Sequence, residues 1–374
     1  MKKQEYLQTS FNKSIREKKV DMSVVTETLV LVAQRVLIYG GLLMIAIGMF
    51  GSLMIILIFR RRPLSRSSCS VYILVNGVLS FFILPLYYLP NIVTFGFQIN
   101  WLALNTPFCK FQMSYGAFMV TSIFLINCFI SFDRYAMSSR SPRIRILSSK
   151  RFARILIIVG LFLTWCLIGI PVAILFENVS STSNGMYTCT SKSTGLLLVA
   201  AFVYYPILEG VLPIVLAIIF WRLTRRHIQT LNNEQVIRRF DKQITRMYLF
   251  QIIINALASF PFAANNLYRS LTLTTVRTQS QADIVEFVRI MSIWIFYIQY
   301  SSDFYIYIIT SNEVRREAKK ILRFWRRRRR VANRIAFVQV LHTTSAIRQF
   351  KNRTTTGGSR PRLLIHPSYI NHVT

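Results

Sequence analysis

Residues 109–135 read CKFQMSYGAFMVTSIFLINCFISFDRY, an apolar run with Cys109 at one end and the charged triplet Asp133-Arg134-Tyr135 at the other. The 24 residues from Cys109 to Asp133 would rise about 36 Å as an α-helix. A helix of that length crosses the ~30 Å hydrocarbon core of a bilayer. The stretch therefore predicts a membrane-spanning helix with a cysteine at one face and charges at the other.

Six further runs of similar length flank this one, and 53% of the 374 residues are hydrophobic. These runs lack the alternation expected of barrel strands, and backbone groups in hydrocarbon need partners within their own segment. We therefore predict an all-α membrane protein, a seven-transmembrane helix bundle. Its spans lie at about 36–59, 69–94, 112–133, 154–175, 197–221, 245–267 and 287–310.

The net charge of +32 lies mostly in short segments between the apolar runs. A nucleic-acid binder would instead carry this charge on a folded soluble face, so no nucleic-acid partner is expected. The connections after the first, third and fifth spans each contain four or more Lys and Arg residues, whereas those after the second and fourth contain only Lys110 and Lys192. The positive-inside rule then predicts an extracellular N-terminus and a cytoplasmic C-terminus.

The chain accordingly divides into an extracellular tail, a seven-transmembrane domain, a short amphipathic helix on the inner leaflet and a basic cytoplasmic tail, at 1–35, 36–311, 312–325 and 326–374. Glycosylation sequons at Asn178 and Asn12 fall on the predicted outer face. The five-arginine run Arg326 to Arg330 is expected to attract anionic lipids. Of the five cysteines, only Cys109 and Cys189 fall in loops or at loop edges, which leaves room for one disulfide there.

The placement of Cys109 and Asp133-Arg134-Tyr135 resembles the third helix of rhodopsin-class (class A) G-protein-coupled receptors. The resemblance implies a disulfide between Cys109 and Cys189. It also implies that Arg134 is held at rest by Asp133 and by Asp241, and is released when the sixth helix swings outward. An interfacial ion pair that merely ends the third helix is the alternative for Asp133 and Arg134.

In the seventh span, Asp303-Phe304-Tyr305-Ile306-Tyr307 resembles the family's N/D-P-x-x-Y signature with Phe304 in place of proline. Asp303 and Tyr307 are therefore expected to act as activation switches. The acid usual in the second helix falls at Phe81, and the tryptophan usual in the sixth falls at Ser259. The chain thus resembles a divergent member that lacks the family's sodium pocket.

Two of the family's ligand classes, amines and retinal, are disfavoured because the chain lacks the residues that they need. Amine receptors of this family carry an Asp where this chain has Gly116, and opsins need a lysine in the seventh span, where none occurs. A peptide is the leading class, which the resemblance to divergent members of the family implies and no peptide-specific residue indicates, and no cofactor is expected. Glu209 is predicted to face the pocket, although a protonated Glu209 bonded to a neighbouring helix is the alternative. Further pocket candidates are Tyr204, Phe262, Asn266 and Tyr297.

The expected function is a receptor that binds an extracellular ligand at the plasma membrane and activates heterotrimeric G proteins. Tail residues such as Thr343, Thr344 and Ser345 are candidate phosphorylation sites for arrestin, or parts of an ordinary disordered tail. An enzyme is disfavoured because all four histidines lie outside the spans, which also argues against a metal site there. A transporter or channel is the alternative, but the sequence has no internal repeat.

Overall fold

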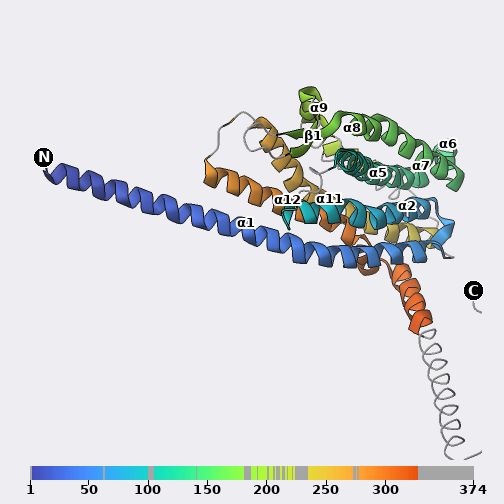
Figure 1. Ribbon diagram of the computed structural model, residues 1–374. Helices are drawn as coiled ribbons and strands as arrows, with labels where there is room; N and C mark the ends of the chain where they lie inside the picture. The colour runs from blue at the N-terminus through green and yellow to red at the C-terminus, as the bar shows by residue number, and fades with distance from the viewer. Residues whose placement is uncertain are drawn as a thin grey trace, which may run out of the picture. The chain divides into compact units, whose positions relative to one another are not determined.

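A computed structural model of the chain gives the arrangement of the helices (Figure 1). The residues it describes are 2–61, 64–99, 105–139, 141–180, 187–191, 193–199, 202–204, 207, 211–212, 215–216, 218–220, 222–223, 235–272, 275 and 278–326. Side chains are described for fewer positions, because those of 2–24 and of most of 235–249 are left out.

Helices dominate the described chain. The long ones are α1 (Lys2–Phe59), α2 (Ser68–Ile83), α5 (Thr106–Ser138), α7 (Lys150–Thr164), α11 (Gln235–Leu271) and α12 (Gln279–Thr310), and the short segments α3 (Leu89–Phe95) and α8 (Ile170–Leu175) continue the spans that begin with α2 and α7. Shorter pieces are η1 (Leu64–Arg66), α6 (Pro142–Ile146) and α9 (Thr194–Val199). Residues 312–326 are helical as well. The two strands β1 (Phe176–Ser180) and β2 (Tyr187–Ser191) form an antiparallel hairpin.

Within the described residues, four helical spans are long and apolar enough to cross a membrane: Val25–Phe59, Ser68–Phe95, Thr106–Met137 and Lys150–Leu175. They correspond to the first four predicted spans. The sixth and seventh correspond to α11 and α12, and the fifth falls largely outside the described residues. On α7, Ile155, Ile158 and Phe162 point outward along one face, as expected of a surface that meets lipid rather than water.

The first helix starts far earlier than the predicted residue 36. No glycine or proline occurs between Lys2 and Tyr39, so nothing in the sequence stops a helix from continuing outward from the span. The apolar part itself begins at Val25. Hydropathy therefore located the span but not the start of the helix.

Two spans are each interrupted by a π-helical turn, η2 (Leu84–Tyr88) between α2 and α3, and η3 (Trp165–Gly169) between α7 and α8. Each turn ends two residues before a proline, Pro90 or Pro171. Proline lacks an N–H and its ring clashes with the carbonyl four residues earlier, so the helix widens there.

The first and last spans pack closely together (Figure 1). A Cβ atom at Gly48 would lie 2.8 Å from Oγ of Ser301 and 3.2 Å from its Cα. Ser301 Oγ donates a hydrogen bond to the Met44 carbonyl oxygen (3.3 Å). Small residues thus let α1 and α12 approach, as is usual between membrane helices. α12 also packs on α11, and α5 packs on α2, α7 and α8.

Candidate functional site

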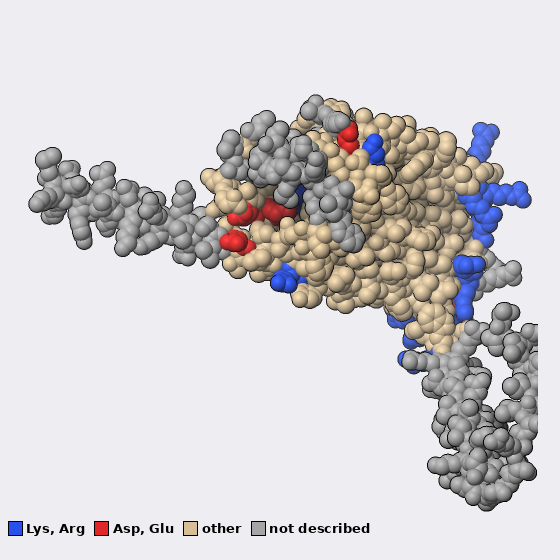
Figure 2. Space-filling model, viewed as in Figure 1, with Lys and Arg blue, Asp and Glu red and all other residues tan. Residues whose placement is uncertain are grey.

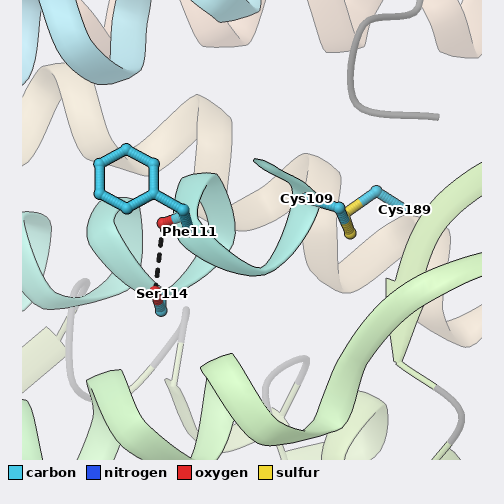
Figure 3. Close-up of a disulfide and its surroundings, with 4 residues drawn as sticks. All are labelled: Cys109, Phe111, Ser114 and Cys189. Atoms are coloured by element: carbon cyan, nitrogen blue, oxygen red, sulfur yellow. Dashed lines mark hydrogen bonds between the residues drawn. A yellow bond between two sulfur atoms is a disulfide. The ribbon is translucent and has the colours of Figure 1, made fainter. Parts of the chain in front are cut away.

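The N-terminal end of α5 is tied to the β-hairpin by a disulfide between Cys109 and Cys189, with the Cα atoms 5.8 Å apart (Figure 3). These are the two cysteines that the resemblance paired. In the hairpin register, Cys189 of β2 lies opposite Asn178 of β1. Glycosylation of Asn178 remains a prediction, and the side chain of Asn12 lies outside the described residues.

A cavity of about 450 Å³ opens between α3, α5, α8, α11 and α12. Four predicted pocket residues line it: Tyr204, Phe262, Asn266 and Tyr297. Glu209, the fifth, lies outside the described residues. Lining residues that the sequence analysis did not single out include Tyr87, Asn91, Asn265, Arg269 and Arg289.

Hydrogen bonds and ring contacts fix several of these side chains. Tyr204 OH lies 2.7 Å from Thr121 Oγ1 and donates to the carbonyl oxygen of Ala117 (3.1 Å). Tyr297 is buried, stacks on Tyr88 with ring centroids 3.8 Å apart, and accepts a bond from Asn91 Nδ2 (3.4 Å). Hydrogen bonds and ring contacts therefore hold Tyr204 and Tyr297 in the wall of the cavity.

Gly116 lies in the wall of this cavity. A Cβ atom added there would lie 2.1 Å from Cε2 of Tyr87, which is far inside van der Waals contact. Tyr87 thus occupies the space that a side chain at position 116 would need. An acidic side chain at position 116 would collide with Tyr87, in addition to being absent from the sequence.

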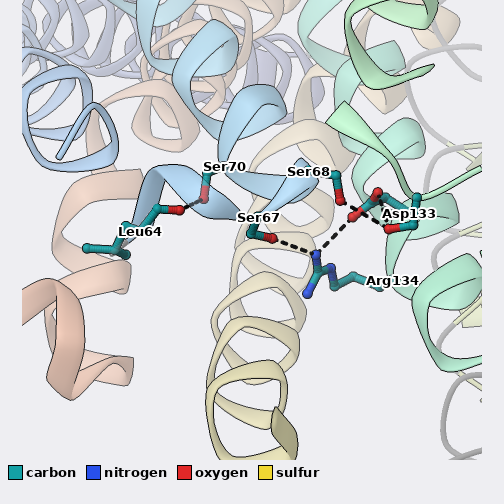
Figure 4. A network of polar contacts seen from close by, with 7 residues as sticks. Leu64, Ser67, Ser68, Ser70, Asp133 and Arg134 are labelled. Carbon is teal, nitrogen blue, oxygen red and sulfur yellow. Dashed lines mark hydrogen bonds and ion pairs between the residues drawn. The ribbon is translucent and has the colours of Figure 1, made fainter. Parts of the chain in front are cut away.

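Near the C-terminal end of α5, the inner end in the predicted topology, Asp133 and Arg134 form a buried ion pair, Oδ2 to Nη2, at 2.8 Å (Figure 4). Asp133 Oδ1 accepts a bond from Ser148 Oγ (2.8 Å), and Arg134 Nη2 donates to Ser67 Oγ (3.4 Å). Ser148 Oγ also lies 3.0 Å from Ser68 Oγ. The pair is therefore anchored to the start of α2 and to the loop before α7.

The other predicted members of this inner site are only partly described. Tyr135 packs against Phe220, with ring centroids 5.8 Å apart. Asp241 lies in α11, but its side chain is outside the described residues, so its predicted pairing with Arg134 remains a prediction. The lipid and arrestin expectations concern the tail from Arg326 onward, which beyond that residue is not described either.

In the C-terminal part of α12, Asp303 is buried and accepts two amide donors. Asn76 Nδ2 of α2 lies 3.1 Å from Oδ2, and Gln251 Nε2 of α11 lies 3.0 Å from Oδ1. Tyr307 OH donates to Gln251 Oε1 (2.5 Å). The two predicted switch residues of α12 thus share one partner, Gln251, which no sequence motif marks.

The three residues that depart from the family pattern each make a described contact. Phe81 is half-buried and packs edge-on against Phe82, and the α2 residue that reaches Asp303 is Asn76, five positions earlier. Phe304 packs edge-on against Phe50 of α1. Ser259 Oγ donates to Gln299 Oε1 (3.4 Å) between α11 and α12.

The surface charge is unevenly distributed. Figure 2 shows Lys and Arg gathered at the end of the molecule where α6 lies, while the acidic side chains visible on this face lie away from that end. Exposed basic residues there include Arg143, Arg145, Arg151 and Arg154. Among the side chains that the structure describes, no three His, Cys, Asp or Glu residues gather as a metal site.

A family model described as "7 transmembrane receptor (rhodopsin family)" matches residues 51–342. A search of curated proteins found no match. The matched range contains the disulfide, the cavity, the inner ion pair and the Asp303 cluster.

Proposed function

The chain belongs to the rhodopsin family of seven-transmembrane receptors, and from this premise we propose that it binds a peptide in the outer cavity and activates a heterotrimeric G protein. Membership makes it a multi-pass plasma-membrane receptor with a seven-helix bundle. The ligand class, the coupling and the orientation are the parts that we propose.

The main support for the proposal is that α5 contributes to three parts of the candidate site. This one helix holds the disulfide at Cys109, the cavity wall at Gly116 and the buried ion pair at Asp133 and Arg134. A ligand that favours one conformation of the outer end changes the population of states at the inner end. The Asp303 cluster lies between them and joins α2, α11 and α12, so α11 cannot move away from α12 without breaking it.

A peptide suits the cavity for two reasons. A volume of about 450 Å³ accommodates a drug-sized molecule or the terminal residues of a peptide. Tyr87 fills the space beside Gly116 where an amine-binding acid would stand. The exposed arginines near α6 support a cytoplasmic position for that end and an extracellular position for the cavity.

The test compares wild type with Arg134→Ala in cells that express reporters for each G-protein family. Peptide pools are applied at matched surface expression, and Arg154→Ala, an exposed arginine on α7, is the control. We expect a peptide-dependent signal in wild type and in the control, and none in Arg134→Ala. Silence of well-expressed wild type across all G-protein families would contradict the proposal and favour a transporter or channel.

An N-terminal epitope tag tests the orientation separately. We expect an antibody to label it on intact cells, and a C-terminal tag to be labelled only after permeabilisation. The opposite pattern would contradict the proposed topology whatever the signalling result.

A further inference from the structure

The charged side chains that line the described part of the cavity are both cationic, Arg269 of α11 and Arg289 of α12. We propose that the ligand presents a carboxylate and that these two arginines bind it. The proposal rests on the proposed function, since it names the chemistry of the ligand for the same cavity. It adds a recognition element that neither the family pattern nor the sequence motifs assign.

Arg289 is held in place by contacts on two sides. Its guanidinium carbon lies 4.2 Å from the centroid of the Phe95 ring, and Nη1 lies 3.1 Å from Oε2 of Glu286. Stacking on a ring fixes the plane of a guanidinium group, whose fork of N–H donors matches a carboxylate. The ring contact with Phe95, which does not depend on Glu286, thus orients the guanidinium group and lowers the entropic cost of binding.

Arg269 lies in the last turn of α11, where a cation is also favoured by the helix dipole. Because Arg269 also lines the cavity, its side chain can contact a bound ligand. Asn265 lies one turn earlier on the same face, and both line the cavity together with Asn266. A carboxylate near Arg269 would therefore find amide donors beside the charge.

The acidic groups of α12 at this end are not among the described residues that line the cavity. Asp283 accepts bonds from Thr26 Oγ1 of α1 (3.3 Å) and from Gln279 Nε2 (3.0 Å), and neither Asp283 nor Glu286 lines the cavity. The Arg289–Glu286 pair is partly exposed, with side chains 25% and 35% accessible. Exposed pairs of this kind are weak, so a ligand carboxylate within the cavity can share or replace Glu286.

Ligand binding to the purified receptor in lipid nanodiscs tests the proposal without requiring signalling. Binding is measured as the increase in the melting temperature of the receptor. The probes are matched sets: a hexapeptide pool with free C-terminal carboxylates, the same pool as C-terminal amides, and arylalkyl carboxylic acids with their primary amides and amines. We expect the acids to stabilise wild type more than their amides or amines. The active set identifies the source of the carboxylate, whether a peptide terminus, an acidic side chain within the amidated pool, or a small organic acid.

Variants then assign the effect to the two arginines. We expect Arg269→Gln and Arg289→Gln each to weaken acid binding roughly tenfold to hundredfold, the usual effect of losing one charge-assisted hydrogen bond. Arg35→Gln, an exposed arginine on α1, is the matched control and should bind like wild type. Glu286→Gln removes the competing carboxylate and should strengthen acid binding severalfold. This gain cannot arise from misfolding.

Equal binding of the arylalkyl acids and their primary amides, a preference for amines, or acid binding that survives in the double Gln variant would each overturn the proposal. So would a failure of every acid to stabilise wild type. A preference for amines would instead support the sequence-based expectation for Glu209. Acid binding without G-protein activation would support the carboxylate site and contradict the proposed coupling. Activation by neutral or amine probes alone would support the coupling and contradict the carboxylate site.

Discussion

Tyr307 donates a hydrogen bond to Oε1 of Gln251 (2.5 Å), while Nε2 of the same Gln251 donates to Asp303 (3.0 Å). One amide side chain on α11 therefore bridges two positions one turn apart on α12. Asn76 completes the arrangement from α2. Every member is buried, so each bond replaces one that water would otherwise provide. Separation of α11 from α12 must break at least two of these bonds.

Replacement of Gln251 by leucine should destabilise the conformation in which α11 packs against α12. Gln251→Leu removes both bonds to α12 and leaves Asp303 with one described donor, Asn76. Losing a buried partner typically costs about 1–3 kcal/mol. We expect higher basal G-protein signalling at matched surface expression and a lower melting temperature of the purified receptor. Ser302→Ala is the control, because Ser302 Oγ bonds only within α12, to the Gln299 carbonyl oxygen. Basal signalling equal to that of the control would argue against a locking role for Gln251.

Asp133→Asn tests the inner ion pair. Asparagine keeps an acceptor for Ser148 but removes the charge that neutralises Arg134 at 2.8 Å. Removing one partner of a buried pair outright costs about 3–5 kcal/mol, and the isosteric change should cost less. We expect raised basal signalling together with reduced thermal stability. Ser148→Ala removes the hydrogen bonds to Asp133 and Ser68 but no charge, so its effects should be smaller in both assays. The reverse order would contradict this account of the pair.

The disulfide should contribute measurably to stability, because Cys109 and Cys189 are 80 residues apart. Closing a loop of that length in the unfolded chain is worth about 4 kcal/mol in the chain-entropy estimate. We expect Cys109→Ser, Cys189→Ser and the double variant to lose surface expression and thermal stability to the same extent. Cys166→Ser, at a free cysteine, provides the comparison and should resemble wild type. Unequal single variants would indicate that one cysteine acts outside the bond.

The sequence predicted the features that depend on local composition. The apolar runs located the spans because hydrocarbon imposes both their length and their lack of charge. Cys109, Asp133 and Arg134 could be recognised because all three lie on one helix at fixed spacing. Asp303 and Tyr307 share a helix in the same way.

Features that arise from contacts between helices could not be predicted. Gln251 and Asn76 belong to no motif, and they meet Asp303 only because α2, α11 and α12 pack around it. Arg269 and Arg289 belong to no motif either, and only packing brings both to one cavity. The start of α1 was misjudged because hydropathy reports the membrane boundary, whereas helix propensity continues past it.

The contact between Gly116 and Tyr87 gives a test of the cavity that is independent of charge. Gly116→Ala would bring a methyl group 2.1 Å from Cε2 of Tyr87, so the ring must shift. Overpacking of this kind costs about 1–3 kcal/mol. We expect lower thermal stability and weaker binding of any probe that occupies the cavity. Gly195→Ala is the matched control, because the nearest atom to its added Cβ is Ser193 Oγ at 3.7 Å.

A second substitution separates this steric effect from a general loss of folding. Tyr87→Leu shortens the side chain that meets position 116, so the double variant should be destabilised less than the sum of the two single changes. A double-mutant cycle on melting temperature and probe binding measures this coupling. Strict additivity would mean that Gly116→Ala acts through the helix backbone and not through Tyr87. A favourable coupling in both assays would establish that Tyr87 occupies the space beside Gly116, which is the reason that an acid at this position could not serve an amine ligand here.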